Sequence, residues 1–189
     1  MVKLYIDQGH NPQNPNAGAE GNGVREQDVN YEVGVQLAAL LSGDPFFEVR
    51  LSRPTPDTQL GSSNATSLAA RVDDANAWGA DYFLSIHCNS SVSDRPSGSE
   101  MYIYREDSPA EELAEDLLEG LHEATGLPNR GVFVNRGLYV LRKTRMPAVL
   151  AELGYLSNPR DAALLESRPD LFAQGLYNSI LEYFDREPD

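Results

Sequence analysis

The sequence is poor in cysteine, and Cys88 is the only one among 189 residues. A single cysteine cannot form an internal disulfide, which excludes a small disulfide-framed secreted protein and a cysteine-rich structural zinc site. The sequence also lacks any apolar run approaching the ~20 residues that a membrane span requires. Its first residues have neither the long apolar segment nor the small-residue cleavage site of a signal peptide. We therefore expect no membrane span.

Basic residues are scarce as well: 15 Lys and Arg stand against 29 Asp and Glu, which gives a formal net charge of −14. This balance argues against a nucleic-acid partner, because proteins that bind the phosphate backbone usually carry a basic stripe. A hydrophobic content of 41% with 23% charged residues is typical of a globular protein. At this length we expect residues 1–189 to form a single domain.

Strand-like and helix-like segments alternate along the chain. The pattern predicts strands at residues 2–6, 46–51, 81–87, 98–104, 139–141 and 148–151, and helices at 26–42, 67–78, 109–125 and 169–185. Ser67 is the expected cap of the second helix, and residues 9–25 form a long loop that we expect to lack secondary structure. Alternation of this kind indicates the α/β class: one three-layer domain with a mostly parallel, twisted sheet of about six strands and helices on both faces. Ligands in such folds bind beyond the carboxyl ends of the strands.

Two of the three histidines follow predicted strands. His10 comes after the first strand and His87 ends the third, whereas His122 lies in an acidic helix and is expected to be solvated. Two imidazoles with one carboxylate form a common catalytic zinc site. The nearest carboxylates are Glu20, in a glycine-rich loop, and Glu26, held at the start of a helix. We favour Glu26 as the third metal ligand.

Metal-assisted hydrolysis also needs a group that accepts a proton from water. Glu152 ends an apolar strand and is the first candidate, because a buried glutamate is costly without a partner or a role. Glu100, on the strand predicted at residues 98–104, is a competing candidate near the same edge of the sheet. The residues alone leave this choice open.

These segments together resemble the zinc-dependent N-acetylmuramoyl-L-alanine amidases of the amidase-3 family, which hydrolyse the bacterial cell wall. The resemblance covers nearly the whole chain and rests on residues 6–10, 18–21, 25–28, 71–72, 75–76, 85–89 and 151–158. It implies that His10, Glu26 and His87 bind one zinc ion, and it favours Glu152 over Glu100 as the catalytic carboxylate. Gln8 and Asn11 depart from the family, which usually has proline and glycine there, so the loop after His10 is expected to take a different path.

The resemblance implies hydrolysis of the amide between N-acetylmuramic acid and the L-alanine of the peptidoglycan stem peptide. Peptidoglycan or muropeptides would be the substrate, and the place of action would be the cell wall or the extracellular space, after export or after release by lysis. We expect a monomer without a separate wall-binding domain. Two alternatives remain: another zinc peptidase or deacetylase acting on wall fragments, and a non-catalytic wall-binding module.

Four further residues are candidates for contacts with the substrate. Asn89 lies two residues after a metal-ligand candidate, and it serves equally well as a turn residue. Arg71 belongs to one of the matching segments. Arg142 and Arg145 lie in a stretch, residues 130–145, that has five basic residues and no acidic one. Such a stretch could attract the free carboxylates of stem peptides.

Overall fold

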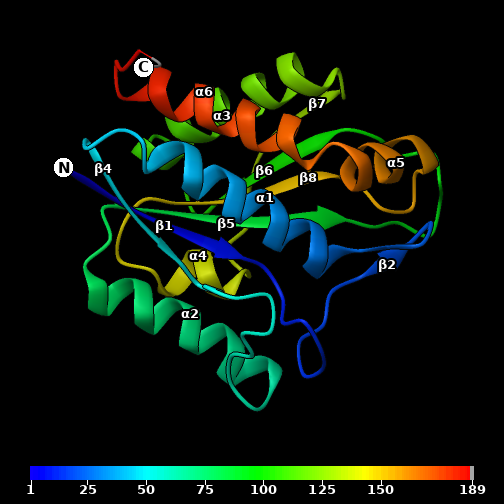
Figure 1. Ribbon diagram of the computed structural model, residues 1–189, viewed down its shortest axis with the longest axis horizontal. Helices are drawn as coiled ribbons and strands as arrows, with labels where there is room; N and C mark the ends of the chain where they lie inside the picture. The colour runs from blue at the N-terminus through cyan, green and yellow to red at the C-terminus, as the bar shows by residue number, and fades with distance from the viewer. Residues whose placement is uncertain (188–189) are drawn as a thin grey trace.

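A six-stranded sheet forms the middle layer of the computed structural model, which describes residues 1–187 (Figure 1). The strand order is β4-β1-β5-β8-β6-β7, and a separate two-stranded sheet pairs β2 with β3. The pairs β1–β4, β1–β5 and β5–β8 are parallel, whereas β6 runs antiparallel to β8 and parallel to β7. The carboxyl ends of β1, β5 and β8 and the amino end of β6 therefore lie at the same edge.

The strands are β1 (Val2–Gln8), β2 (Glu20–Gly21), β3 (Val24–Arg25), β4 (Phe47–Leu51), β5 (Tyr82–Asn89), β6 (Ser99–Ile103), β7 (Asn129–Val134) and β8 (Ala148–Tyr155). The helices are α1 (Glu26–Leu41), α2 (Asn64–Trp78), α3 (Pro109–Thr125), α4 (Tyr139–Lys143), α5 (Pro159–Ser167) and α6 (Pro169–Tyr183). Among residues 1–187, no helix is long and apolar enough to cross a membrane.

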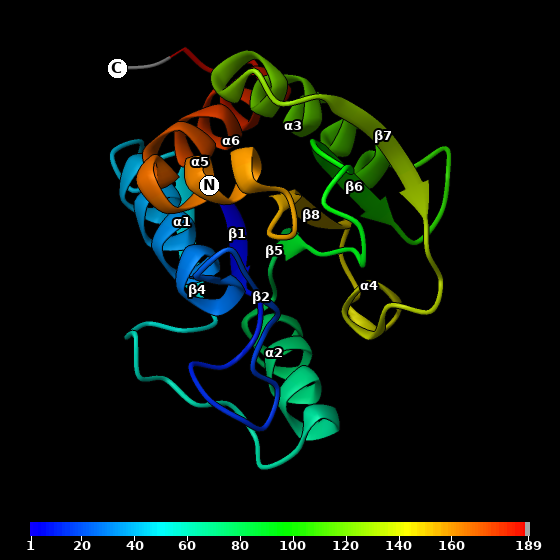
Figure 2. The ribbon, with the colours of Figure 1, turned by 90° about the vertical axis from the view of Figure 1, so that its right-hand side faces the viewer.

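The two faces of the sheet are covered unequally. Helices α1, α3, α5 and α6 pack on one face around the larger apolar core, whereas only α2 and the short α4 lie on the other face (Figures 1 and 2). Alternation along the strands explains the two cores, because Leu84 and Ile86 face the larger one and Phe83 faces the smaller one. Strand β7 ends the sheet at its outer edge (Figure 2).

The structure confirms the α/β class and the mostly parallel six-stranded sheet. The helix predicted at residues 109–125 is α3, which begins at Pro109 and ends before Gly126 in the left-handed conformation. Two segments were predicted wrongly. Residues 139–141 belong to helix α4 rather than to a strand, and the sixth strand is instead β7. An apolar run of three residues is too short for its periodicity to distinguish a strand from a helix.

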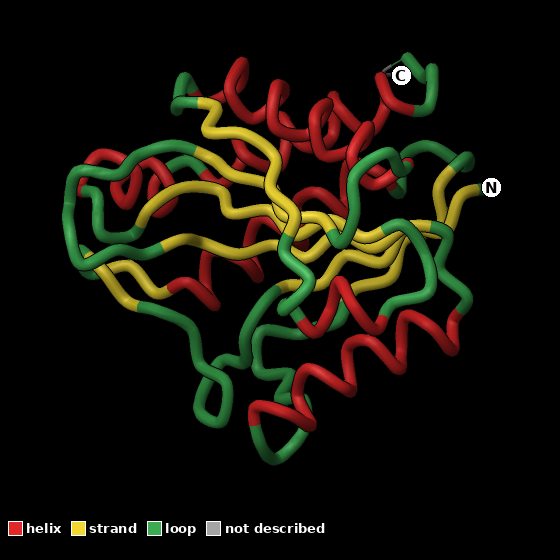
Figure 3. The backbone as a smooth tube through the Cα atoms, turned by 180° about the vertical axis from the view of Figure 1, so that it is seen from behind, coloured by secondary structure: helices red, strands yellow, loops and turns green. Residues whose placement is uncertain are grey.

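Two further expectations need correction at the loops. Helix α2 begins three residues before the predicted cap, because Ser63 and Thr66 form a reciprocal capping box, while Ser67 is buried inside the helix and its Oγ accepts a hydrogen bond from Asn16. The loop of residues 9–25 is also not structureless, since it contains the β2–β3 pair. Its first half lies beside the loop of residues 52–63 (Figure 3), where Asn11 bonds both polar backbone groups of Leu60.

A buried ion pair connects α2 to the end of β1. The guanidinium of Arg71 lies 2.7 Å from Asp7, and both side chains are 1% exposed. Arg71 also donates to the carbonyl oxygens of Gln8 and His10, and Asp7 accepts a second hydrogen bond from Ser85. Burial alone would raise the pKa of Asp7, but the Arg71 charge and these hydrogen bonds hold that pKa below its ordinary value.

We predict that Arg71→Met lowers the free energy of unfolding by about 3–5 kcal/mol, because it leaves the Asp7 carboxylate buried without its counter-charge. The surface pair of Arg50 and Asp74, also at 2.7 Å, provides the matched control. Arg50→Met should cost no more than about 1 kcal/mol. Urea denaturation followed by circular dichroism measures both, and equal losses in the two variants would contradict the structural role given to Arg71.

Candidate active site

Three side chains from three elements converge at the carboxyl edge of the sheet. His10 follows β1, Glu26 begins α1 and His87 lies near the end of β5. Nε2 of His10 and Nδ1 of His87 lie 3.1 and 3.0 Å from the same oxygen, Oε1 of Glu26. The potential ligand atoms of the three residues all lie within 4.8 Å of one another. The structure therefore brings together the three residues that the sequence predicted as metal ligands.

Glu26 is held rigidly as a carboxylate. Its Oε2 accepts a hydrogen bond from the backbone N–H of Ala19, and its Oε1 accepts one from the N–H of Cys88. Burial alone would raise the pKa of Glu26, but hydrogen bonds from the His10 and His87 rings hold it far below its ordinary value. The position at the first turn of α1 also favours negative charge. Glu26 is thus ionised and fixed, as a metal ligand must be.

The surroundings of the two imidazoles fit a metal ion. Nδ1 of His10 is buried and has no hydrogen-bond partner among the described residues. Gly9 passes so close to His87 that an added Cβ would lie 2.4 Å from the ring atoms Cε1 and Nε2. A Cβ on Gly18 would lie 2.8 Å from Oε2 of Glu26. Two imidazoles and one carboxylate are suitable donors for zinc and leave a fourth position open.

Glu152 lies beside this cluster on the neighbouring strand. It pairs in register with His87 across β5 and β8, so both side chains project from the same face of the sheet. Its Oε2 is buried and has no hydrogen-bond partner within residues 1–187. Burial, together with the nearby charges of Glu26 and Glu100, raises the pKa of Glu152 well above its ordinary value. A half-buried carboxylate with one buried oxygen that lacks a partner, next to three metal-ligand candidates, is suited to proton transfer.

Glu100, the competing candidate, has the opposite environment. It lies directly across from Glu152 on β6. Its oxygens accept hydrogen bonds from Tyr155 and Arg130 at Oε1 and from Tyr102 and Asn89 at Oε2. Burial would raise the pKa of Glu100, but the bonds from Tyr155, Arg130 and Tyr102 lower it. A carboxylate engaged by four donors is a poor proton acceptor, so the structure favours Glu152 for that role.

The residues around Glu100 line an open cavity of about 480 Å³ at the edge of the sheet. Tyr102, Tyr155 and the exposed ring of Phe133 contribute aromatic surface, and Asn89 contributes a polar one. Asn89 ends β5, and its side chain is fixed on both sides, because Nδ2 donates to Glu100 and Oδ1 accepts from the N–H of Ser90.

Three of the predicted substrate contacts lie elsewhere. Arg71 is 1% exposed, and its two terminal nitrogens donate to Asp7 and to the carbonyl oxygens of Gln8 and His10, so it supports the site from behind. Arg142 and Arg145 are exposed, but they lie near Ala148 at the amino end of β8, whereas Glu152 lies toward its carboxyl end. Arg71 is thus too buried to contact a substrate, whereas the expected contacts of Arg142 and Arg145 with the substrate stay a prediction.

The remaining acid and the third histidine are also outside the site. Glu20 is exposed and pairs with Arg25 at 3.3 Å. His122 is exposed on α3, and its Nδ1 lies 2.7 Å from the carbonyl oxygen of Leu127. Neither side chain is part of the cluster of His10, Glu26 and His87.

Apart from Asn89, the sequence analysis missed the residues that surround Glu100. Tyr102 lies two positions after Glu100 on β6, so strand alternation could have placed it on the same face. Tyr155 stands in a segment that carried the family resemblance, and its ring lies 5.3 Å from the Arg130 guanidinium carbon. No local signal identifies Arg130, because its contact with Glu100 depends on β7, the strand that the sequence pattern did not reveal.

A potential metal cluster, an adjacent glutamate without a partner and an open cavity are the components of a metal-dependent hydrolase centre. Comparison with known families agrees. The profile of the amidase-3 family, N-acetylmuramoyl-L-alanine amidase, matches residues 4–182. The chain belongs to this family and is an enzyme of the N-acetylmuramoyl-L-alanine amidase class.

Individual relatives support the assignment. The chain is 33% identical to the N-acetylmuramoyl-L-alanine amidase CwlM of Bacillus licheniformis, covering 98% of this chain and 70% of CwlM. It is 33% identical to the amidase LytC of Bacillus subtilis, covering 96% of this chain but only 35% of LytC. The structure superimposes on the catalytic domain of the amidase CwlV from Bacillus (Paenibacillus) polymyxa with a TM-score of 0.85 at 36% identity, covering 99% of this chain and 100% of that domain.

We predict that Gly9→Ala displaces the His87 ring and lowers the affinity of the site for zinc by about tenfold or more. Competition with a fluorescent chelator measures that affinity. Gly43→Ala is the control, because its Cβ would meet only the carbonyl oxygen of Leu40, at 3.3 Å. Unchanged zinc affinity in Gly9→Ala would show that the ring of His87 is not held where the structure places it.

Proposed function

We propose that the chain hydrolyses the amide between N-acetylmuramic acid and the L-alanine of the peptidoglycan stem peptide, with one zinc ion held by His10, Glu26 and His87. The observation that carries this proposal is the buried, unpartnered Oε2 of Glu152 next to those three residues. Family membership supports the choice of bond, since the relatives are named for it. The chemistry of the donor set supports the choice of metal.

When bound, zinc would polarise the amide carbonyl and lower the pKa of a coordinated water from about 15.7 to about 7. Neutral imidazoles and an ionised carboxylate are the protonation states that such a site requires. The low pKa of Glu26 and the two hydrogen bonds from the backbone keep that carboxylate ready to bind without reorganisation.

Glu152 is the proposed proton carrier. Its carboxylate accepts a proton from the attacking water, and the protonated group then donates that proton to the departing amine nitrogen. Burial and the charges of Glu26 and Glu100 favour its protonated form, whereas a bound dication would favour its ionised form. These opposing influences keep both forms of Glu152 accessible, which a group acting first as base and then as acid requires.

The cavity beside Glu152 is the proposed place for the stem peptide. Its aromatic walls and fixed amide can contact a peptide in extended conformation, and we propose that Asn89 orients the substrate there. Residues 1–189 would act as one catalytic domain and as a monomer. The substrate places the enzyme at the cell wall or outside the cell, reached by export or by release on lysis.

We predict that Glu152→Gln lowers the rate of hydrolysis by about 10²–10⁴-fold while zinc binding is retained, because glutamine is isosteric but cannot accept a proton. Glu20→Gln is the control and should be fully active, since Glu20 makes only an exposed ion pair. The measurement is the release of free L-alanine amino termini from purified peptidoglycan, with the products identified by mass spectrometry.

The same measurement distinguishes the alternatives. Shortened stem peptides would identify a peptidase, and loss of acetyl groups would identify a deacetylase. If the wild-type chain binds walls but releases no more product than Glu152→Gln, the chain is a wall-binding module.

We also predict that the purified chain carries one zinc ion, loses its activity in a chelator and regains it when zinc is restored. His10→Gln should abolish zinc retention, because it removes one of the three convergent ligands. His122→Gln is matched in chemistry and should retain both zinc and activity, because His122 lies on α3 outside the cluster. Elemental analysis of the three proteins tests this, and a zinc-free wild type with full activity would contradict it.

A further inference from the structure

A second cavity, of about 310 Å³, lies at the opposite end of β8 from Glu152. It is bounded by the first turn of α3, the end of α4 and the start of β8, and Ala148 lies in its wall. Ala148 and Glu152 are four residues apart on one strand, which corresponds to about 13 Å at ~3.3 Å per residue. This cavity is therefore separate from the candidate active site.

Three arginines line this cavity: Arg105, Arg142 and Arg145. Within residues 1–187, none of them has a carboxylate oxygen within 4.0 Å, and no acidic side chain is part of the lining. Arg50 and Arg168 form ion pairs, whereas Arg95, Arg136 and Arg160 also have none within the described residues. What distinguishes Arg105, Arg142 and Arg145 is that these three guanidinium groups gather around one cavity. They form a site that attracts anions.

The surrounding backbone adds to the positive character of this cavity. Helix α3 begins there, and its N-cap residue, Ser108, does not cap the helix with its side chain but donates to the carbonyl oxygen of Arg105. The positive end of the helix therefore faces the cavity without a side-chain acceptor. The first turn also carries two acidic residues outside the cavity lining, Glu111 and Glu112, and Glu111 accepts a hydrogen bond from the N–H of Asp107.

The positions of the arginines are defined by their neighbours. The guanidinium carbon of Arg142 lies 5.9 Å from the ring of Tyr139, a contact that leaves its N–H groups free to donate. The N–H of Arg145 donates to Oδ1 of Asn76 on α2, which fixes the backbone beside the cavity. Met146 and Pro147 provide apolar surface between the charged groups. A ligand that fits has an oxyanion for the guanidinium forks and a less polar body.

We propose that this cavity, which we call the basic cavity, binds an anionic group of the wall polymer, a phosphate or a carboxylate, and thereby holds the enzyme on the wall away from the bond it cleaves. The choice of a wall polymer rests on the proposed function, whereas the anion site itself does not. Of the five basic residues between positions 130 and 145 that the sequence analysis noted, Arg130 contacts Glu100, and Arg142 and Arg145 line the basic cavity.

The anion site is tested first with simple probes. The ¹⁵N-labelled chain is titrated with inorganic phosphate and, separately, with acetate, at constant ionic strength maintained with chloride. We expect saturable shifts of the backbone amide signals of Ala110, Thr144 and Arg145 with at least one probe, and their loss in the double variant Arg142→Gln/Arg145→Gln. Absence of saturable shifts with both probes would overturn the anion site.

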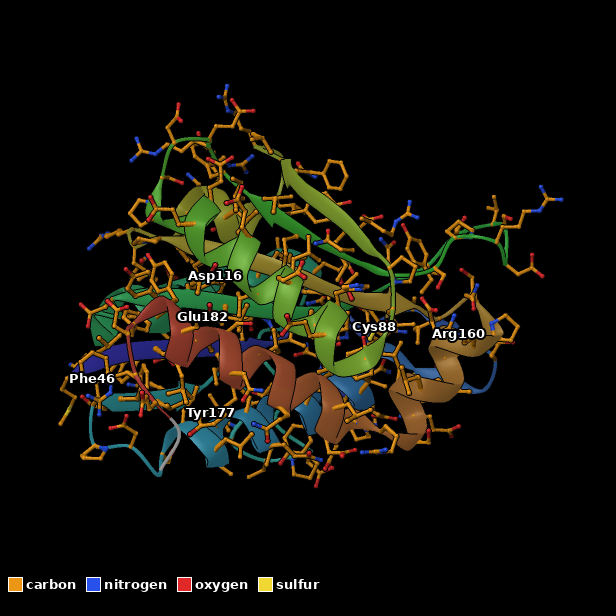
Figure 4. All side chains as sticks on the ribbon, turned by 90° about the horizontal axis from the view of Figure 1, so that it is seen from above. Phe46, Cys88, Asp116, Arg160, Tyr177 and Glu182 are labelled. Carbon is orange, nitrogen blue, oxygen red and sulfur yellow. The ribbon has the colours of Figure 1, made fainter. Side chains whose placement is uncertain are left out.

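The role on the wall is tested by co-sedimentation with purified walls before and after chemical removal of their phosphate-containing polymers. We expect Arg142→Gln/Arg145→Gln to raise the dissociation constant for walls about tenfold or more. If this difference disappears on stripped walls, the bound group is a phosphate, and if it persists, the group is a carboxylate of the peptidoglycan. The control is Arg160→Gln/Arg168→Gln, which removes the same charge at α5, at the other end of the sheet (Figure 4).

Activity separates this proposal from the proposed function. On a small soluble muropeptide, the kcat/KM of Arg142→Gln/Arg145→Gln should equal that of the wild type, because the basic cavity does not contact the cleaved bond. Equal wall affinity of the two double variants would overturn the role on the wall. A wild type that binds walls in this manner but cleaves no muropeptide would contradict the proposed function and leave the basic cavity supported.

Discussion

The buried ion pair between Arg71 and Asp7 is the contact on which the geometry of the site depends. A buried guanidinium needs a counter-charge and acceptors, and the terminal nitrogens of Arg71, which is 1% exposed, find them in the Asp7 carboxylate and the carbonyl oxygens of Gln8 and His10. These groups belong to the end of β1 and to the first residues of the loop. Arg71 therefore holds His10 in a left-handed conformation, with φ of 68°, that a histidine rarely adopts. Arg71 contacts no reacting atom, but it fixes the position of the His10 backbone and so of the first metal-ligand candidate.

The register of the sheet places three ionisable groups in one row, with His87, Glu152 and Glu100 on adjacent strands. Two carboxylates facing each other across β8 and β6 would repel if both were ionised. Their surroundings resolve this conflict, because Glu100 receives four hydrogen bonds, including one from Arg130, and Glu152 has a buried oxygen that receives none. The site thus distinguishes two chemically identical side chains by what lies next to them, and the difference in pKa between them follows from the same contacts.

The sequence predicted that His10 and His87 meet at one edge of the sheet, because parallel strands align their carboxyl ends and β1 and β5 could be recognised from their apolar patterns. Glu26 was favoured on a separate ground, its position at the start of a helix. The burial of the Arg71 side chain could not be predicted, since it results from the packing of α2 against the end of β1. The basic stretch was visible as a charge pattern, but its position was not, because it depends on α4 being a helix and on β7 being a strand. Prediction failed where segments were short and tertiary contacts decided their conformation.

The net charge of −14 is not spread evenly over the surface. Helices α3 and α6 pack closely enough that a Cβ on Gly120 would meet the carbonyl oxygen of Gly175 at 2.7 Å, and the two helices bring Asp116 and Glu182 together (Figure 4). Burial, followed by the charge of Glu182, raises the pKa of Asp116. Asp116 lies seven residues beyond the start of α3, about 10 Å along the helix at ~1.5 Å per residue. Exposed charges at that separation are largely screened at physiological ionic strength, where the Debye length is about 8 Å. An anion near the first turn of α3 is therefore shielded from the Asp116 and Glu182 charges, and its environment is set by the local groups, which are the cavity arginines, the positive helix end and the first-turn residues Glu111 and Glu112.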